Sequence, residues 1–166
     1  EDVYRVEMKN ILNSQYLADM YFGGPESQKA TVVFDTGSNW LAVTTQMCDS
    51  CKSKAYDTTK STKKSTNNET IEQKYGAAYL SGIKYNDDVC LHSKQDKTKS
   101  DFACLENFQF MAITEESGLN KGIDGILGLG PSTENGPSFM HHAYQKGLID
   151  RALLSFSLGY NNGADV

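Results

Sequence analysis

A short apolar run that ends in an acidic residue constrains this chain more than any other part of its sequence. Residues 31–34 are Thr, Val, Val and Phe, a β-branched and apolar run that favours a buried strand. Asp35 follows directly, and a carboxylate that leaves water needs hydrogen-bond donors to stay ionised. Thr36 and Ser38 offer hydroxyl groups beside it, while Gly37 allows a tight turn. The pattern predicts a strand end presenting a carboxylate for acid–base chemistry on water, although an aspartate that only closes a turn fits the same residues.

Composition indicates an ordinary globular protein. The 166 residues are 39% hydrophobic and 22% charged, which is enough for one domain with a real core. The net charge of −5 argues against a nucleic-acid partner. The sequence contains no run of about 18 apolar residues, so it predicts no membrane-spanning helix. The sequence begins at Glu1 without a signal-peptide pattern, so we expect a mature or excised piece of a protein.

The four cysteines allow three disulfide pairings. The two local pairings, Cys48 with Cys51 and Cys90 with Cys104, are favoured because each closes a short loop. A zinc site made by all four is the alternative, weakened because the second pair lacks Cys-x-x-Cys spacing. Disulfides would indicate an oxidising compartment. Asn68 begins an Asn-x-Thr glycosylation sequon in a polar stretch, which agrees with secretion.

The pattern along the chain predicts many strands and one clear helix. The helix is expected at residues 138–147, with Pro137 near its start and Gly147 at its end. Residues 47–69 are polar and are expected to form a surface loop. The expected strands are 16–22, 30–34, 40–45, 70–75, 80–91, 102–114, 123–130 and 153–158, with an amphipathic entry segment at 3–15.

Four segments, taken in order, resemble the amino-terminal lobe of the pepsin-like aspartic proteases. The resemblance covers nearly the whole chain and implies an all-β fold with one or two short helices. It also implies that residues 1–166 form one lobe of a bilobal enzyme whose C-terminal lobe is absent from this chain. The four segments are 33–38 (Val-Phe-Asp-Thr-Gly-Ser), 75–82 (Tyr-Gly-Ala-Ala-Tyr-Leu-Ser-Gly), 124–130 (Asp-Gly-Ile-Leu-Gly-Leu-Gly) and 139–158.

The resemblance implies an aspartic endopeptidase that works at acid pH without a cofactor or a metal. Two aspartates, one from each lobe, share a proton and hold a water molecule. The ionised member takes a proton from the water as it attacks the peptide carbonyl, and the protonated member donates to the carbonyl oxygen. Asp35 is the catalytic residue expected here, supported by Thr36, Gly37 and Ser38.

Residues of the second segment match the flap of the family, a hairpin that closes over the substrate. Tyr75 would exclude water from the site, while Gly76 and Ala77 would present backbone groups to the peptide. Val33 and Ile126 match positions that line the apolar pocket, and both fit a plain core role equally well.

The sequence departs from the family pattern at two places. The family commonly has a tryptophan a few residues after the serine, where this chain has Ala42; Trp40 lies two positions earlier. The flap usually has glycine where Ala78 stands, which would be costly if that residue needs a positive φ.

Two other groups are assigned no chemistry. Asp124 matches a family aspartate without catalytic duty. His141 and His142 have no carboxylate or cysteine at ligand spacing, so they are interpreted as surface residues.

No second Asp-Thr-Gly or Asp-Ser-Gly occurs in the chain, so half of the aspartate pair is missing. We expect the C-terminal lobe or heavy chain of the same protease to supply it. The alternatives are a catalytically inactive pepsin-like binding protein and a homodimeric protease of the retroviral type. Further expectations are polypeptide substrates, pepstatin-type inhibitors, a zymogen form, and a secreted, lysosomal or vacuolar location.

Overall fold

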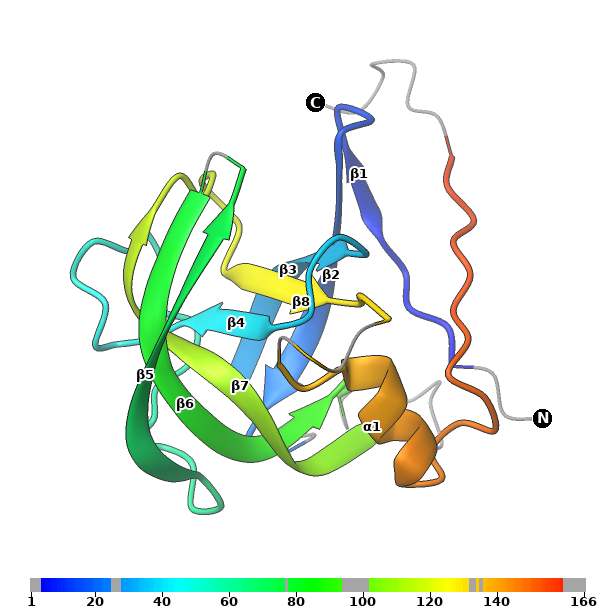
Figure 1. Cartoon of the computed structure of the whole chain (residues 1–166). Coiled ribbons are helices and arrows are strands. Elements are labelled where there is room, and N and C mark those ends of the chain that lie inside the picture. The colour runs from blue at the N-terminus through cyan, green and yellow to red at the C-terminus, as the bar shows by residue number, and fades with distance from the viewer. Residues whose placement is uncertain are drawn as a thin grey trace.

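The computed structural model describes residues 4–24, 28–76, 78–93, 102–131, 134 and 136–159. These residues form an eight-stranded sheet and one short helix (Figure 1). The strand order is β1-β2-β3-β8-β4-β7-β6-β5. The elements are β1 (Lys9–Ile11), β2 (Gln15–Phe22), β3 (Gln28–Asp35), β4 (Leu41–Thr44), β5 (Ser65–Tyr75), β6 (Ala78–Cys90), β7 (Cys104–Ser117), β8 (Gly125–Gly128) and α1 (Phe139–Gln145).

The sheet is strongly curved because β2 also pairs with β6. Tyr21 and Phe22 lie opposite Cys90 and Val89, so the strands from β2 through β8 to β6 close into a ring. Most neighbours are antiparallel, but β3 pairs with β8 and β4 with β7 in parallel. The mostly-β fold expected from the sequence is therefore confirmed.

Alternation along the strands builds one apolar cluster on each face of the sheet. On β3, Ala30 and Val32 belong to the first cluster, while Val33 packs against the second. A slip of one residue would exchange these faces, so burial fixes the register. The first cluster centres on an aromatic trio, Phe22, Tyr56 and Phe110, whose ring centroids lie 5.2–5.6 Å apart. The second contains Leu17, Trp40, Ala42, Leu80, Met111, Ile113 and Ile126.

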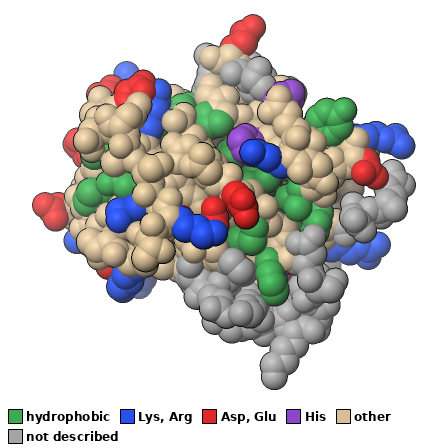
Figure 2. Space-filling model, turned by 90° about the horizontal axis from the view of Figure 1, so that it is seen from below, with side chains coloured by type: hydrophobic (Ala, Val, Ile, Leu, Met, Phe, Trp, Pro, Cys, Tyr) green, Lys and Arg blue, Asp and Glu red, His purple; other side chains and the backbone are tan. Residues whose placement is uncertain are grey.

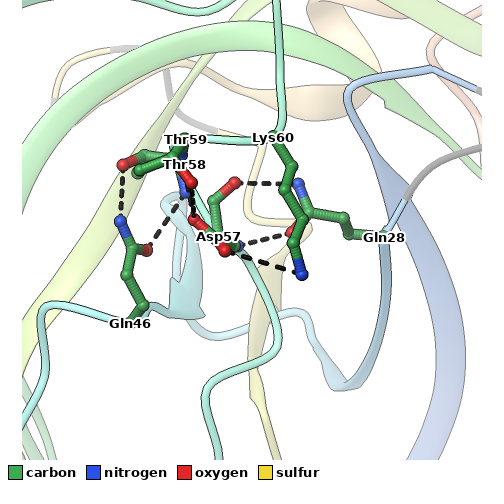
Figure 3. Close-up of polar contacts among 6 residues, drawn as sticks. All are labelled: Gln28, Gln46, Asp57, Thr58, Thr59 and Lys60. Atoms are coloured by element: carbon green, nitrogen blue, oxygen red, sulfur yellow. Dashed lines mark hydrogen bonds and ion pairs between the residues drawn. The ribbon is translucent and has the colours of Figure 1, made fainter.

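The polar segment between β4 and β5 is held by hydrogen bonds rather than by apolar packing alone. Gln28 of β3 accepts from the Asp57 N–H at 2.6 Å and donates to the Asp57 carbonyl at 3.0 Å (Figure 3). Gln46 bridges Thr58 in the same way, accepting from its N–H and donating to its hydroxyl. Tyr56 is fully buried and donates to an Asp87 carboxylate oxygen at 2.7 Å. These side-chain hydrogen bonds add to a single parallel bridge between Thr45 and Tyr56.

Cysteine pairing follows the two local connections that the sequence favoured. Cys48 is joined to Cys51, and Cys90 to Cys104. Cys90 and Cys104 face one another across the β6–β7 ladder, so this disulfide fastens two neighbouring strands.

Two sequence predictions about the limits of the strands are wrong. The loop expected at residues 47–69 ends earlier, because β5 begins at Ser65 and its polar residues still pair with β6. No strand forms at residues 153–158, which lie outside the sheet. This segment runs beside the N-terminal part of the chain (Figure 1), and the Asn10 side chain donates to the Gly159 carbonyl at 2.8 Å. Leu153 and Leu158 remain 74% and 51% exposed.

The predicted helix is shorter than expected. It spans Phe139–Gln145, and the Ser138 side chain caps it by accepting from the His141 N–H. Gly147 follows with a φ of 71°. No helix among the described residues is long and apolar enough to cross a membrane.

Candidate active site

Asp35 is the last residue of β3, a strand in the middle of the sheet. It lies opposite Gly128 in the parallel β3–β8 ladder. Its backbone carbonyl accepts from the Leu129 N–H at 2.7 Å. The backbone of Asp35 is therefore fixed by a strand that lies about 90 residues away in the sequence.

Both carboxylate oxygens of Asp35 accept a hydrogen bond. The Gly37 N–H donates to Oδ1 at 2.9 Å, and the Ser38 hydroxyl donates to Oδ2 at 2.6 Å. Hydrogen bonds of this kind stabilise the ionised form of a carboxylate. The Thr36 side chain is exposed and makes no hydrogen bond within the described part of the chain. The turn thus holds one carboxylate firmly and leaves one hydroxyl free.

Glycines of β8 and of the residues after it bring the backbone close to the loop 35–40, which we call the Asp35 loop. The Gly130 N–H donates to the Ser38 carbonyl at 2.7 Å. A Cβ atom on Gly128 would lie 2.4 Å from the Asn39 carbonyl carbon, which no side chain tolerates. The sequence analysis did not assign these glycines to the site, although residues 124–130 form one of the four segments that resemble the family.

Tyr75 lies at the end of β5 and packs against the apolar cluster beneath the hairpin of β5 and β6, which we call the flap hairpin. Its hydroxyl is buried and has no hydrogen-bond partner among the described residues. Burial, followed by the negative charge of Asp35, raises the pKa of Tyr75 to about 12, and the Ser38 hydroxyl opposes the shift. Tyr75 therefore reaches the immediate surroundings of the carboxylate without a well-aligned hydrogen bond to it.

The tip of the flap hairpin is a tight turn between Tyr75 and Ala78, which face one another in the ladder. Gly76 adopts a φ of 45°, so the left-handed position falls on a glycine. Ala78 begins β6 and has no positive φ, so the sequence departure at this residue causes no strain. Ala77, predicted to contact substrate, lies outside the described residues.

Val33 and Ile126 are brought together by the β3–β8 ladder, in which they lie directly opposite one another. Both contact the cluster that also carries Tyr75, and Ile126 is buried. They lie on the flap side of the sheet, next to Asp35. Their contact with a substrate remains a prediction.

Trp40 and Ala42 both belong to the cluster beneath the flap hairpin. The Trp40 indole lies against Gly136, where a Cβ atom would be 2.4 Å from Nε1. The Lys84 ammonium lies 5.7 Å from the centre of the Trp40 ring. Ala42 is completely buried and offers no hydrogen-bonding side chain. The Tyr75 hydroxyl accordingly has no indole partner.

Asp124 and His142 contribute to packing and hydrogen bonding within the fold. An Asp124 carboxylate oxygen accepts from the Thr31 N–H at 2.8 Å, which links β3 to the segment before β8. His142 packs edge-on against Phe108 at 5.2 Å between ring centres. Within the described ranges, no three His, Cys, Asp or Glu side chains are grouped to hold a metal ion.

Comparison with known proteins agrees with this geometry. The family model described as eukaryotic aspartyl protease matches residues 15–165. Aspartic proteinase A3 of Arabidopsis thaliana is 32% identical over 97% of this chain and 32% of its own length. Mouse cathepsin D is 33% identical over 91% of this chain and 39% of its own length. Vacuolar protease A of Aspergillus fumigatus is 33% identical over 95% of this chain and 39% of its own length.

The chain thus spans about a third of the length of the curated relatives that it matches, within their N-terminal part. A strand that ends in a hydrogen-bonded aspartate, a tyrosine-bearing hairpin beside it and the family match over residues 15–165 lead to one conclusion. The chain belongs to the eukaryotic, pepsin-like aspartyl protease family.

Proposed function

We propose that this chain is the N-terminal lobe of an aspartic endopeptidase and that Asp35 supplies one of its two catalytic carboxylates. The observation that carries the proposal is the geometry of that carboxylate, whose two oxygens accept from Gly37 and Ser38. Such an arrangement favours an ionised carboxylate that is able to accept a proton from water. The second carboxylate comes from a C-terminal lobe or heavy chain of the same protease.

In the proposed reaction, the pair of aspartates holds a water molecule between them. Because two like charges at close range do not both ionise, the pair shares one proton. The ionised member takes a proton from the water as its oxygen attacks the peptide carbonyl carbon. The other member donates its proton to the carbonyl oxygen, which gives a neutral tetrahedral intermediate. The free Thr36 hydroxyl is placed to brace the equivalent loop of the second lobe.

The apolar surface near the N-terminal segment supports the proposal that this chain binds a partner. A groove of about 360 Å³ lies between α1, the N-terminal segment and residues 148–156. Leu153, which lines it, is 74% exposed, and residues 153–159 have no strand partner in the described structure. Large exposed apolar side chains of this kind mark interaction surfaces. We assign this surface to the second lobe.

The substrate would be an extended polypeptide that lies between the flap hairpin and Asp35. Backbone groups at the tip of the flap hairpin are suited to hydrogen bonding with such a chain. Val33 and Ile126 on the same side would accept apolar side chains of the substrate. On the face seen in Figure 2, acidic and basic side chains are interspersed rather than gathered by sign.

We also propose a secreted, lysosomal or vacuolar location. Two disulfides favour an oxidising route. Two relatives, by their names, are a cathepsin and a vacuolar protease.

The decisive experiment is peptide hydrolysis at acid pH by the complete protein and its Asp35→Asn variant. We expect the variant to lose activity while its thermal unfolding stays unchanged, because asparagine keeps the shape of the side chain. Asp49→Asn is the matched control, since Asp49 is fully exposed at the surface. An Asp35→Asn variant with full activity would overturn the proposal.

The same preparation separates the alternatives. A wild-type protein that binds pepstatin or peptide without cleaving it would be an inactive binding protein. A fully active dimer of this chain alone, identified by its mass in solution, would instead indicate the retroviral type of assembly.

A further inference from the structure

β5 forms a free edge of the sheet. It is the last strand in the order, and β6 is its one neighbour in the described structure. Its first six residues are all exposed. A long edge with unpaired backbone groups is able to pair with a strand of another molecule, and natural proteins protect such edges.

The ladder between β5 and β6 is broken in the exposed half of the strand. Thr66 pairs with Tyr85 and Thr70 with Ile83, so three residues of β5 oppose one residue of β6. Asn68 lies within this bulge and adopts a φ of 60°. Asparagine tolerates this left-handed conformation better than most residues.

The bulge contains two neighbouring asparagines with different surroundings. The Asn67 side chain is engaged with Glu69: it accepts from the Glu69 N–H at 3.1 Å and donates to the Glu69 carboxylate at 3.2 Å. The backbone N–H of Asn68 donates to the Thr66 hydroxyl at 2.9 Å. The Asn68 side-chain amide is exposed and makes no hydrogen bond to another residue that the structure describes.

The sequence distinguishes the same asparagine. Asn68-Glu69-Thr70 is the single Asn-x-Ser/Thr sequon of the chain. The sequon thus falls on the asparagine with the exposed side-chain amide and the positive φ, not on its neighbour, whose side chain is hydrogen-bonded to Glu69. The two disulfides indicate the oxidising compartment in which such sequons are modified.

We propose that Asn68 carries an N-linked oligosaccharide and that this glycan covers the free edge of β5. In the transfer, Asn68 Nδ2 forms a bond to C1 of the first sugar and loses one proton. The bond between that C1 and a phosphate oxygen of the donor, an oligosaccharide linked to a polyprenyl diphosphate, breaks at the same time. The polyprenyl diphosphate leaves with the bonding electrons.

The position of Asn68 suits a protective role rather than a catalytic one. It precedes Tyr75 by seven positions along β5, which corresponds to about 20 Å at the usual rise of a strand. A bulky, hydrated glycan at the bulge would block a second strand from the exposed half of β5. It would leave the tip of the flap hairpin open.

Occupancy is tested on the complete protein secreted by a eukaryotic host. Peptide N-glycosidase converts a glycosylated asparagine into aspartate, and peptide mass mapping locates the change. We expect conversion at Asn68 and none at Asn67. Unmodified asparagine at position 68 in the secreted protein would overturn the proposal.

Matched variants separate loss of the glycan from loss of folding. Asn68→Asp removes the acceptor and keeps a residue that tolerates a positive φ. Thr70→Ala removes the sequon at an exposed site, whereas Thr70→Ser retains it. We expect the first two variants to lose the mass of one glycan, and Thr70→Ser and Asn67→Asp to keep it.

The protective role is measured by sedimentation of the same variants. We expect Asn68→Asp and Thr70→Ala to show a several-fold larger associated fraction than Thr70→Ser, with unchanged peptidase activity per folded molecule. Native wild-type protein treated with peptide N-glycosidase should associate to the same extent. Equal association of the glycan-bearing and glycan-free proteins would refute the role as a cover for the edge.

Discussion

The Asp35 loop and the flap hairpin lie beside one another but are supported in different ways. Asp35 ends a central strand, and its carbonyl, its carboxylate and the Ser38 carbonyl are all hydrogen-bonded. Tyr75 ends an edge strand, and its buried hydroxyl has no partner among the described residues. Beneath the loop, glycines bring backbones into contact, whereas nothing lies within 4 Å of the Cβ position of Gly76 at the flap tip.

This difference suits the two roles that we propose for the loop and the hairpin. A group that performs proton transfer has to be held within a fraction of an ångström, which the centre of a sheet provides. A group that closes over a substrate has to move, and an edge hairpin with few constraints permits this. The following substitutions, in order of decreasing effect, test whether the loop and the hairpin really differ in this way.

The largest effect is expected from Gly125→Ala, on the strand that supports the Asp35 loop. The new Cβ atom would lie 1.9 Å from the Ala42 carbonyl oxygen, so β8 and β4 would have to separate. We expect a loss of about 3 kcal/mol or more in the free energy of unfolding, measured with urea. Gly159→Ala is the control, because its Cβ position is open. Equal stability of the two variants would contradict tight packing beneath the loop.

Ser38→Ala is expected to have the next largest effect, and it acts on activity. The ionised carboxylate of Asp35 would lose the hydrogen bond to Oδ2. We expect kcat/KM to fall by about tenfold, as for a lost charge-assisted hydrogen bond.

Ser38→Thr keeps the hydroxyl and serves as the control for that measurement. An unchanged kcat/KM in Ser38→Ala would mean that this hydrogen bond does not contribute to the reaction.

Gly76→Ala probes the flap hairpin. The Cβ position is open, so the cost comes from the φ of 45° alone and should be about 1 kcal/mol. Amide hydrogen exchange should quicken in β5 and β6 near the tip and stay unchanged in β3 and β8. Faster exchange in β3 as well would show that the hairpin and the Asp35 loop are mechanically coupled.

Tyr75→Phe is expected to have the smallest effect, with the opposite sign at neutral pH. Removing a buried hydroxyl without a partner should raise the free energy of unfolding by up to about 1 kcal/mol. Protonated Tyr75 makes its full contribution to the stability of the wild type below pH 10.0, the usual pKa of tyrosine. That contribution declines as the pH rises towards the folded-state pKa of about 12. This decline should be reduced in the phenylalanine variant, as followed by urea unfolding between neutral and alkaline pH. A destabilised variant at neutral pH would mean that the hydroxyl has a partner after all.

The sequence predicted the strands best where apolar residues alternate or gather. The expected strand at 16–22 differs by one residue from β2, Gln15–Phe22. β5 was predicted too short, because Ser65 and the polar residues after it carry no apolar pattern, although they pair with β6. The segment 153–158 was predicted as a strand from its leucines and phenylalanine, yet a strand also needs a neighbour, and none is present in the described structure.

Some features of the candidate site could be predicted from a local sequence motif, and others could not. Asp35, Gly37 and Ser38 are consecutive or nearly so, and a sequence motif therefore specifies their hydrogen bonds directly. The surroundings of Trp40 and the unpartnered hydroxyl of Tyr75 follow from which strands become neighbours, and no local pattern contains that information.

The sequence by itself therefore determined the mostly-β character and the acidic turn after an apolar strand. These features arise from interactions between residues that are close in the chain. Only the tertiary structure decided that β8 lies between β3 and β4, that Tyr75 reaches Asp35, and that β5 is an exposed edge. The physical reason is that such contacts join residues as far apart as Thr31 and Asp124, whose pairing depends on the packing of the whole sheet.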